Sequence, residues 1–329
     1  MPHERQNTVS VHGISVAWAC VGLQDDPAAR LLARFPTMDG PFVPDVTLVL
    51  GPATAASRSD PTLEGYCQTC YFDNVKGFSR DGDLLLWDGF SRVRVDSLGV
   101  KITGEVADPC RTDRQLFTAV MLFVALIVAL RHRQLFHIHA AALVHPRGVG
   151  WMLIGGSGAG KTTSTLSLLV NGFGYLGDDA SLLRHRDSSV EVLSIPREFR
   201  LTDATLAAFP HLRSYASEQV SEGDIKRLVD PREAFPDAFR SSVIALEILL
   251  FPEVTGSART ELLAMPADDA MGQLLLASAI LAVDWMPHPR EHLVLLETLL
   301  RGTRSFRLML GRDVLARPGL LLDRIEQAL

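Results

Sequence analysis

The sequence predicts an α/β protein in which a P-loop nucleotide-binding domain follows a β-rich α+β domain. Three observations support this. The chain of 329 residues is long for a single hydrophobic core, and its first third alternates short apolar runs with turn residues. Residues 155–163 read GGSGAGKTT, which matches G-x-x-x-x-G-K-[ST] between a predicted strand and a predicted helix. We therefore expect two domains, at 1–110 and 111–329.

Composition and charge narrow the classes of function. Apolar residues make up 47% of the chain and charged residues 21%, which is typical of a folded protein. The net charge of −6 provides no broad attraction to nucleic acid or to an anionic membrane, so we expect neither as a partner. The first ten residues lack the apolar segment of a secretory signal, and a cytoplasmic location is expected.

Short strands are expected throughout the first domain. Apolar runs at 46–50, 84–87 and 93–96 are bounded by Gly, Pro, Asp or Ser, and Asp88-Gly89 between the last two predicts a hairpin. No constellation of His, Asp, Glu or Ser in this third indicates catalysis. We expect a role in recognition, packing or assembly, with a homo-oligomer as one option.

An apolar helix is expected at 112–133, where the second domain begins. Residues 116–130 carry no charge and are flanked by Arg114 and Arg131. A membrane span needs about 20 such residues, so a buried core helix is the favoured reading and a span is the alternative.

The four cysteines include one closely spaced pair, Cys67 and Cys70. A zinc site would need a second pair, and a thioredoxin-like motif would open a helix, whereas residues 65–72 resemble a strand or turn. Reduced, half-buried thiols are the expectation, with metal or redox chemistry as the alternative.

The P-loop motif predicts a polyphosphate cradle. Its small residues let the backbone N–H groups point inward, next to the positive end of the following helix dipole. The predicted nucleotide-binding residues are Gly155, Gly156, Ser157, Gly158, Ala159, Gly160, Lys161, Thr162 and Thr163. Lys161 would reach the β- and γ-phosphates, and the Thr162 hydroxyl would ligate Mg²⁺, so ATP and Mg are the expected cofactors.

Two further segments flank this loop. Residues 136–144 are predicted to form one strand, which makes a hairpin with the strand that ends at Gly155. Residues 173–176 form a brief strand before Asp178 and Asp179. If the two aspartates extend that strand, their side chains alternate, so that one faces the metal and the other the acceptor. A solvated turn is the alternative.

Three of these features resemble the HPr kinase/phosphorylase family, whose P-loop fold is related to that of phosphoenolpyruvate carboxykinases. They are His139 within HIHAAALV, the loop GGSGAGKTT, and Gly177-Asp178-Asp179, at spacings close to those of the family. The resemblance covers about 137–252. It implies a P-loop kinase domain of this type that transfers the γ-phosphoryl group of ATP to a serine hydroxyl on a peptide or small protein.

The resemblance also implies roles for individual residues. Asp178 would accept the hydroxyl proton, Asp179 would assist with the metal or with orientation, and His139 would support the carboxylate or contact phosphate. Judged from the residues alone, a histidine on a strand is more often a core side chain. His137, two positions earlier, is a rival to His139.

A fainter similarity involves Glu198-Phe199-Arg200, which is similar to the family's Glu-apolar-Arg element. It implies a metal-side role for Glu198 and an active-site role for Arg200, with Arg197 as the competing arginine that would steady charge on the phosphoryl group. A solvated loop is the alternative.

Several positions depart from the family pattern. Gly156 stands where the loop of the HPr-recognising members has a charged residue, Thr162-Thr163 stands for Ser-Glu, and Ala140 replaces the glycine after the histidine. These differences put the HPr substrate, the reverse phosphorylase activity and the hexamer in doubt. The chain looks more similar to the related kinases that modify ribosomally made peptides, including lasso-peptide precursors.

Two other functions compete with a peptide or protein kinase. The same fold could serve a small-molecule kinase, which would need a closed pocket lined with cations in place of an open groove. A nucleotide-gated binding module that hydrolyses ATP slowly and acts through residues 1–110 belongs to a different class. Retained ATP binding without transfer to any acceptor would favour that module.

Overall fold

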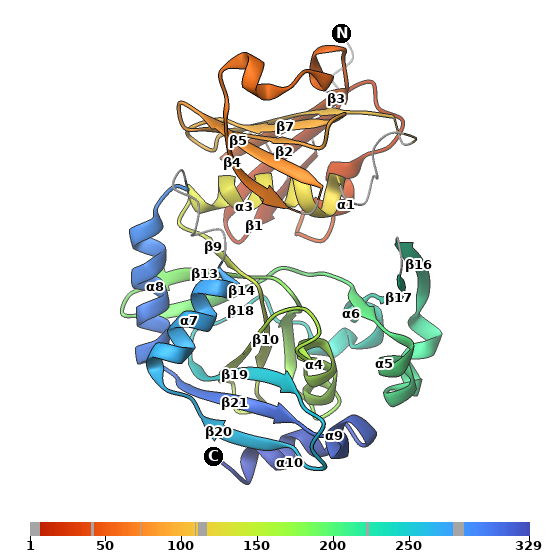
Figure 1. Ribbon diagram of the computed structural model, residues 1–329, viewed down its shortest axis with the longest axis vertical. Coiled ribbons are helices and arrows are strands. Elements are labelled where there is room, and N and C mark those ends of the chain that lie inside the picture. Colours follow the sequence, from red (N-terminus) through yellow and green to blue (C-terminus); the bar gives the residue numbers. More distant parts are fainter. Residues whose placement is uncertain are drawn as a thin grey trace. The chain divides into compact units, whose positions relative to one another are not determined.

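The computed structural model describes residues 7–40, 43–72, 74–108, 110, 117–221, 224–278 and 286–329. The chain divides into two compact units, one comprising residues 1–136 with 280–289 and the other residues 137–279 with 290–329 (Figure 1). The apolar helix groups with the first unit, whereas the sequence placed it at the start of the second domain. The boundary at residue 110 stays a prediction.

A mixed eight-stranded sheet forms the first unit, in the order β1-β2-β3-β8-β7-β6-β5-β4. Its strands are β1 (Asn7–Val11), β2 (Ile14–Cys20), β3 (Val46–Pro52), β4 (Cys67–Phe72), β5 (Val75–Arg80), β6 (Asp83–Trp87), β7 (Arg92–Val95) and β8 (Lys101–Val106). Pairs β2/β3 and β3/β8 are parallel, and the other pairs are antiparallel. The expected strands and the β6–β7 hairpin at Asp88-Gly89 are confirmed.

Helices and turns complete the first unit. They are α1 (Pro27–Leu32), the 3-10 turns η1 (Ala56–Arg58) and η2 (Pro61–Glu64), the π-helical η3 (Phe117–Leu122) and α3 (Phe123–Arg131). All nine residues of α3 are buried, and the helix packs against β7 and β8. Residues 111–116 of the expected helix lie outside the described residues. In the part of the chain that the structure describes, no helix has both the length and the apolar character needed to cross a bilayer.

The cysteine pair lies in β4, so the expected strand is confirmed there. All four cysteines are free thiols. Burial raises the pKa of Cys70, which keeps that thiol protonated and unreactive.

A six-stranded sheet organises the second unit, in the order β12-β10-β11-β19-β21-β20. The strands are β10 (Ala140–Val144), β11 (Gly150–Ile154), β12 (Gly174–Gly177), β19 (Leu246–Val254), β20 (Glu261–Ala264) and β21 (Arg304–Leu310). Strands β10 and β11 form the expected antiparallel hairpin, while β11, β19 and β21 run parallel. The sheet shares a core with α4 (Lys161–Leu169) and α10 (Leu320–Glu326).

Two smaller sheets belong to the same part of the chain. One has the order β18-β14-β13-β9 and the other β15-β17-β16. Their strands are β9 (Phe136–Ile138), β13 (Ser181–Arg186), β14 (Ser189–Ser194), β15 (Phe199–Leu201), β16 (Ser217–Ser221), β17 (Asp224–Val229) and β18 (Ser242–Val243). The remaining helices are α5 (Asp203–Ala208), η4 (Pro210–Tyr215), α6 (Pro231–Ala234), η5 (Pro236–Ala238), α7 (Ala267–Ala277), α8 (Pro289–Arg301) and α9 (Arg312–Ala316).

Strand directions explain why distant motifs meet. β10 is antiparallel to both of its neighbours, so β11 and β12 run in the same direction and end at the same edge of the sheet, where β10 begins. The P-loop follows β11, Asp178 follows β12, and His139 directly precedes β10. The topology therefore gathers all three sequence motifs at one edge.

Candidate functional site

The P-loop connects β11 to α4, as the sequence predicted, and the helix begins at Lys161. Gly158 and Gly160 have φ values of 79° and 98°, which L side chains rarely adopt. A Cβ at Gly160 would also clash with Leu310 Cδ1. A Cβ at Gly156 or Gly158 would meet no atom within 4 Å, so the loop faces open space at these positions.

The start of α4 supplies the electrostatics of the loop. The first N–H groups of a helix have no partner inside it and carry the positive end of its dipole. Gly160 caps α4 in a left-handed conformation, and no side chain caps this end. The N–H groups at the helix start are therefore suited to bind an anion such as phosphate.

Lys161 places an ammonium group at this edge. Its side chain is only 4% exposed, and Nζ donates to the carbonyl oxygens of Gly155 (2.8 Å) and Gly156 (3.2 Å). Nζ also lies 3.3 Å from Asp179 Oδ1 and 3.2 Å from His139 Nε2. These contacts hold the ammonium group beside the loop.

Asp178 is buried next to the first turn of α4. Only 3% of the residue is exposed, and its Oδ2 accepts a hydrogen bond of 2.8 Å from the Thr162 hydroxyl. Its other oxygen, Oδ1, is buried without a hydrogen-bond partner. Burial, followed by the neighbouring Asp179 charge, raises the pKa of Asp178 to about 7. A buried carboxylate oxygen without a partner is costly, and a role in binding or catalysis is one physical reason to retain it.

The alternation of the two aspartate side chains would require Asp178 and Asp179 to extend the strand, and they do not. β12 ends at Gly177, and Asp179 has a left-handed φ of 64°, so the backbone turns between the two aspartates. The turn sends Asp178 toward Thr162 and Asp179 toward Lys161 and His139. Asp179 is 42% exposed, in contrast to Asp178.

His139 lies at a bend and not within one continuous strand. The segment predicted as a strand at 136–144 splits into β9 and β10, which belong to different sheets, and His139 connects them. Its N–H donates to Ala277 O at 2.9 Å, and its Nε2 lies 3.8 Å from Asp179 Oδ1. Burial, aided by the Lys161 charge, lowers the pKa of His139. Burial lowers the pKa of the rival His137 to about 3, which makes that residue a neutral interior group.

The segment at 198–200 is placed differently from the rest of the predicted site. Phe199 and Leu201 of β15 are buried in the core, so the intervening Arg200 side chain is exposed on the other face of the strand. Within the described ranges, no hydrogen bond or ion pair joins Arg200 to the P-loop cluster, which comprises His139, Lys161, Thr162, Asp178 and Asp179. Glu198 is also exposed.

Arg197 is the arginine whose charge reaches the cluster. It is among the groups that lower the pKa of Asp178, after the Thr162 hydroxyl and Lys161, and it contributes to lowering the pKa of His139. The Tyr175 hydroxyl donates to Arg197 O at 3.4 Å, which ties this backbone to β12. The sequence named Arg197 as a competitor of Arg200 but held no signal to choose between them.

The residues fit a magnesium-bound nucleotide. Among the residues that the structure describes, no three His, Cys, Asp or Glu side chains form a metal cluster. A P-loop does not need one, because phosphate oxygens and water supply most ligands of its Mg²⁺. The Thr162 hydroxyl and the unpartnered Oδ1 of Asp178 offer two neighbouring oxygens of the hard type that Mg²⁺ prefers.

No protein-family model matches the sequence, and no curated protein is significantly similar to it. Among solved structures, the chain is similar to the HPr(Ser) kinase/phosphatase from Coxiella burnetii, with 12% sequence identity, 58% of this chain and 90% of that chain covered, and a TM-score of 0.31. An identity and a TM-score this low do not bear on substrate or mechanism, so the chemistry rests on the residues of the site.

Proposed function

We propose that the second unit is an ATP- and Mg²⁺-dependent kinase that transfers the γ-phosphoryl group to a Ser or Thr hydroxyl of a peptide or small protein. The observation that carries this proposal is the arrangement of Thr162 and Asp178. A hydroxyl at the start of the P-loop helix is bonded to a buried carboxylate whose second oxygen has no partner. This arrangement has a clear chemical use beside a polyphosphate and little structural use without one.

The chain would bind the nucleotide through loop 155–160 and the first turn of α4. Lys161 would exchange its bonds with the loop carbonyls for the β- and γ-phosphates, and Thr162 would hold Mg²⁺. Bound Mg²⁺ would neutralise the phosphate charge that develops during transfer. The charges of Asp179 and Arg197 would contribute to the electrostatic potential at the phosphoryl group that is transferred.

Asp178 would receive the proton of the acceptor hydroxyl on Oδ1. The bond from Thr162 fixes the carboxylate, so Oδ1 keeps one orientation. The same oxygen could instead bind Mg²⁺, and the two roles predict different kinetics for Asp178→Asn. Loss of the base lowers kcat and leaves the affinity for MgATP unchanged. Loss of a metal ligand weakens MgATP binding, and excess Mg²⁺ restores part of the activity.

Transfer of label from γ-labelled ATP into a lysate of the native host, separated into peptide and small-molecule fractions, tests this proposal. We expect label in a peptide or small-protein band with the native chain and none with Asp178→Asn. Asp187→Asn is the matched control, because Asp187 is exposed in the β13–β14 turn. Label in a small molecule would favour the small-molecule kinase, and release of free phosphate alone would favour the nucleotide-gated module.

A further inference from the structure

The first unit contains a cavity of about 240 Å³ on the face of its sheet that carries Arg92 and Arg94, far in sequence from the P-loop. Side chains alternate along β7, so Val93 and Val95 are buried in the core while Arg92 and Arg94 point to the other face. Arg80 of β5 contributes a third guanidinium group to the lining. A single small cavity thus collects three arginines in a protein whose net charge is negative.

Strand register builds the floor of this cavity. Leu85, Arg94 and Thr103 lie directly opposite one another on β6, β7 and β8. Arg92 lies opposite Glu105 in the next row on the same face. Each of these residues lines the cavity. Because strand pairing fixes this register, the floor residues hold defined positions relative to one another.

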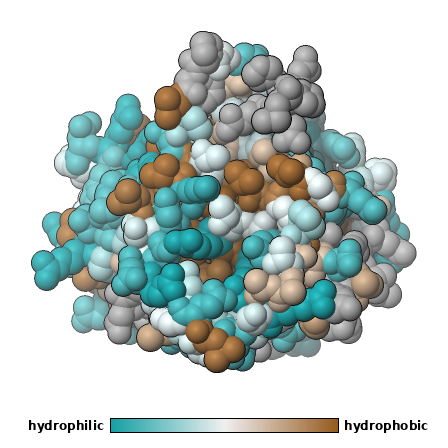
Figure 2. Space-filling view, turned by 90° about the horizontal axis from the view of Figure 1, so that it is seen from above, coloured by the Kyte–Doolittle hydropathy of each residue, from teal (hydrophilic) through white to brown (hydrophobic). Residues whose placement is uncertain are grey.

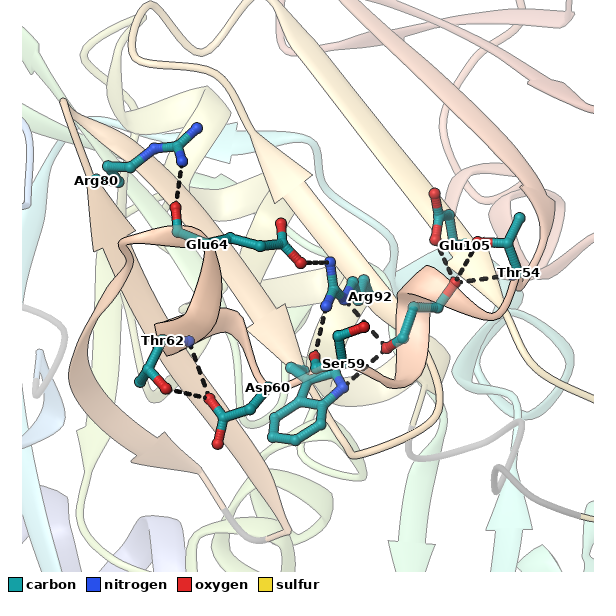
Figure 3. Close-up of polar contacts among 10 residues, drawn as sticks. Thr54, Ser59, Asp60, Thr62, Glu64, Arg80, Arg92 and Glu105 are labelled. Atoms are coloured by element: carbon teal, nitrogen blue, oxygen red, sulfur yellow. Dashed lines mark hydrogen bonds and ion pairs between the residues drawn. The ribbon is translucent and has the colours of Figure 1, made fainter.

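Arg92, in the floor of the cavity, forms hydrogen bonds to residues 57–64, the segment that forms the wall of the cavity (Figure 3). Its Nε donates to Ser57 O (3.0 Å), its Nη1 to Glu64 Oε1 (2.8 Å), and its Nη2 to Ser59 O. The Arg92 side chain is only 11% exposed. The Ser57 hydroxyl in turn donates to the Glu105 carboxylate. Arg92, Glu64 and Glu105 therefore form hydrogen bonds within the protein that hold the wall in place, and we treat them as structural groups.

Arg80 is used differently. Its guanidinium carbon lies 4.6 Å from the centre of the Tyr66 ring, and its Nη1 donates to the backbone oxygen of Glu64. Within the described ranges no carboxylate pairs with Arg80. The ring and the carbonyl hold the guanidinium group in place while most of its donors are left for another acceptor.

Two neighbours extend this set of donors. Arg94 pairs with Asp83 along one edge of its guanidinium group, and its side chain is 49% exposed. Thr103 adds a hydroxyl to the lining. On the face of the molecule seen from above, hydrophilic side chains gather beside apolar ones (Figure 2). The cavity therefore offers converging donors that are positioned before any ligand binds.

We propose that this cavity binds a small ligand that bears a carboxylate or phosphate group, with Arg80 as the principal contact and Arg94 and Thr103 as secondary contacts. The planar guanidinium fork matches both anions and binds them through two parallel hydrogen bonds. The cavity is smaller than a typical pocket for a drug-sized molecule, which favours a compact anion. The proposal does not rest on the kinase activity of the second unit.

Isothermal titration calorimetry of the full chain at low ionic strength tests the proposal, with inorganic phosphate and succinate as separate probes. The P-loop also attracts phosphate, so the titrations are repeated with Lys161→Ala. We expect at least one probe to bind Lys161→Ala, and Arg80→Gln in that background to weaken this binding about tenfold or more. Binding of phosphate alone identifies a phosphate-bearing ligand, and binding of succinate alone a carboxylate.

Arg30→Gln is the matched control, because it removes the same charge from an arginine of α1 that is 60% exposed. Introduced into Lys161→Ala, it should leave the affinity for the probe equal to that of Lys161→Ala alone. Thr103→Val keeps the shape of the floor and should weaken binding a few-fold at an unchanged thermal midpoint, so it decides the matter if Arg80→Gln unfolds. Failure of both probes to bind Lys161→Ala, or equal losses in Arg80→Gln and Arg30→Gln, would overturn the proposal.

Discussion

Ser57 and Asp83 of the first unit are buried and hydrogen-bonded, whereas Asp178 of the second unit buries a carboxylate oxygen that has no partner. The Asp83 carboxylate accepts from Arg94 and from the Ser97 N–H, and so both of its oxygens are used. Asp178 instead stands beside a second carboxylate, Asp179. Burial therefore does not by itself distinguish the two carboxylates, whereas the presence or absence of hydrogen-bond partners does.

The largest effect should come from removing the charge of the unsatisfied carboxylate. Asp178→Asn should lower phosphoryl transfer about 10²–10⁴-fold, the range in which a general base contributes. The thermal midpoint should stay the same or rise, because asparagine can accept the Thr162 hydrogen bond without a buried charge next to Asp179. Assays of transfer and thermal unfolding on the same preparation check both parts. A large fall in midpoint would assign Asp178 to the structural class.

Two glycines with similar backbone conformations, Gly13 in the first unit and Gly160 in the second, allow the two units to be compared by substitution. Gly160 and Gly13 have similar left-handed φ values of 98° and 93°, but only at Gly160 would a Cβ meet neighbouring atoms. Gly160→Ala should cost about 2–4 kcal/mol from backbone strain and overpacking, and Gly13→Ala about 1 kcal/mol from strain alone. Urea unfolding of both variants measures the difference. Equal costs would mean that α4 shifts to accommodate the methyl group.

The satisfied carboxylate of the first unit should behave in the opposite way to Asp178. Asp83→Asn should cost about 1 kcal/mol of stability, because it weakens the hydrogen bonds to Arg94 and Ser97 on a partly exposed face. Phosphoryl transfer should not change. A double-mutant cycle with Arg94→Gln, followed by urea unfolding, isolates the pair. Lost transfer at full stability would show that the first unit takes part in the reaction.

The smallest effect concerns pH and a carboxylate at the surface. The Ser15 hydroxyl and N–H donate to Asp45 and hold its pKa below the usual range. A depressed folded-state pKa contributes stability above the unfolded-state pKa of about 3.9, and this contribution disappears as the pH falls through the folded value. Asp45→Asn should therefore lower the thermal midpoint slightly at pH 7 and by less at pH 2. An equal deficit at both pH values would exclude this linkage.

Local patterns were sufficient to predict the elements that surround the P-loop motif of the second unit. The glycines and Lys161 of the P-loop, the strand before them and the helix after them follow from residue types at fixed spacing, because this short range determines the backbone conformation. The β6–β7 hairpin and the apolar α3 were predictable for the same reason. The sequence did not indicate that His139 separates two strands of different sheets, since sheet membership depends on residues far along the chain.

The sequence by itself determined that this chain has a P-loop motif, a histidine before it and two adjacent aspartates after it. Only the tertiary structure decided how these groups lie relative to one another. The left-handed turn at Asp179 directs one carboxylate into the interior and the other toward Lys161, and the burial of Phe199 and Leu201 turns Arg200 away while the charge of Arg197 reaches Asp178. Desolvation and distance set these roles, and both are properties of the packed chain that no local pattern contains.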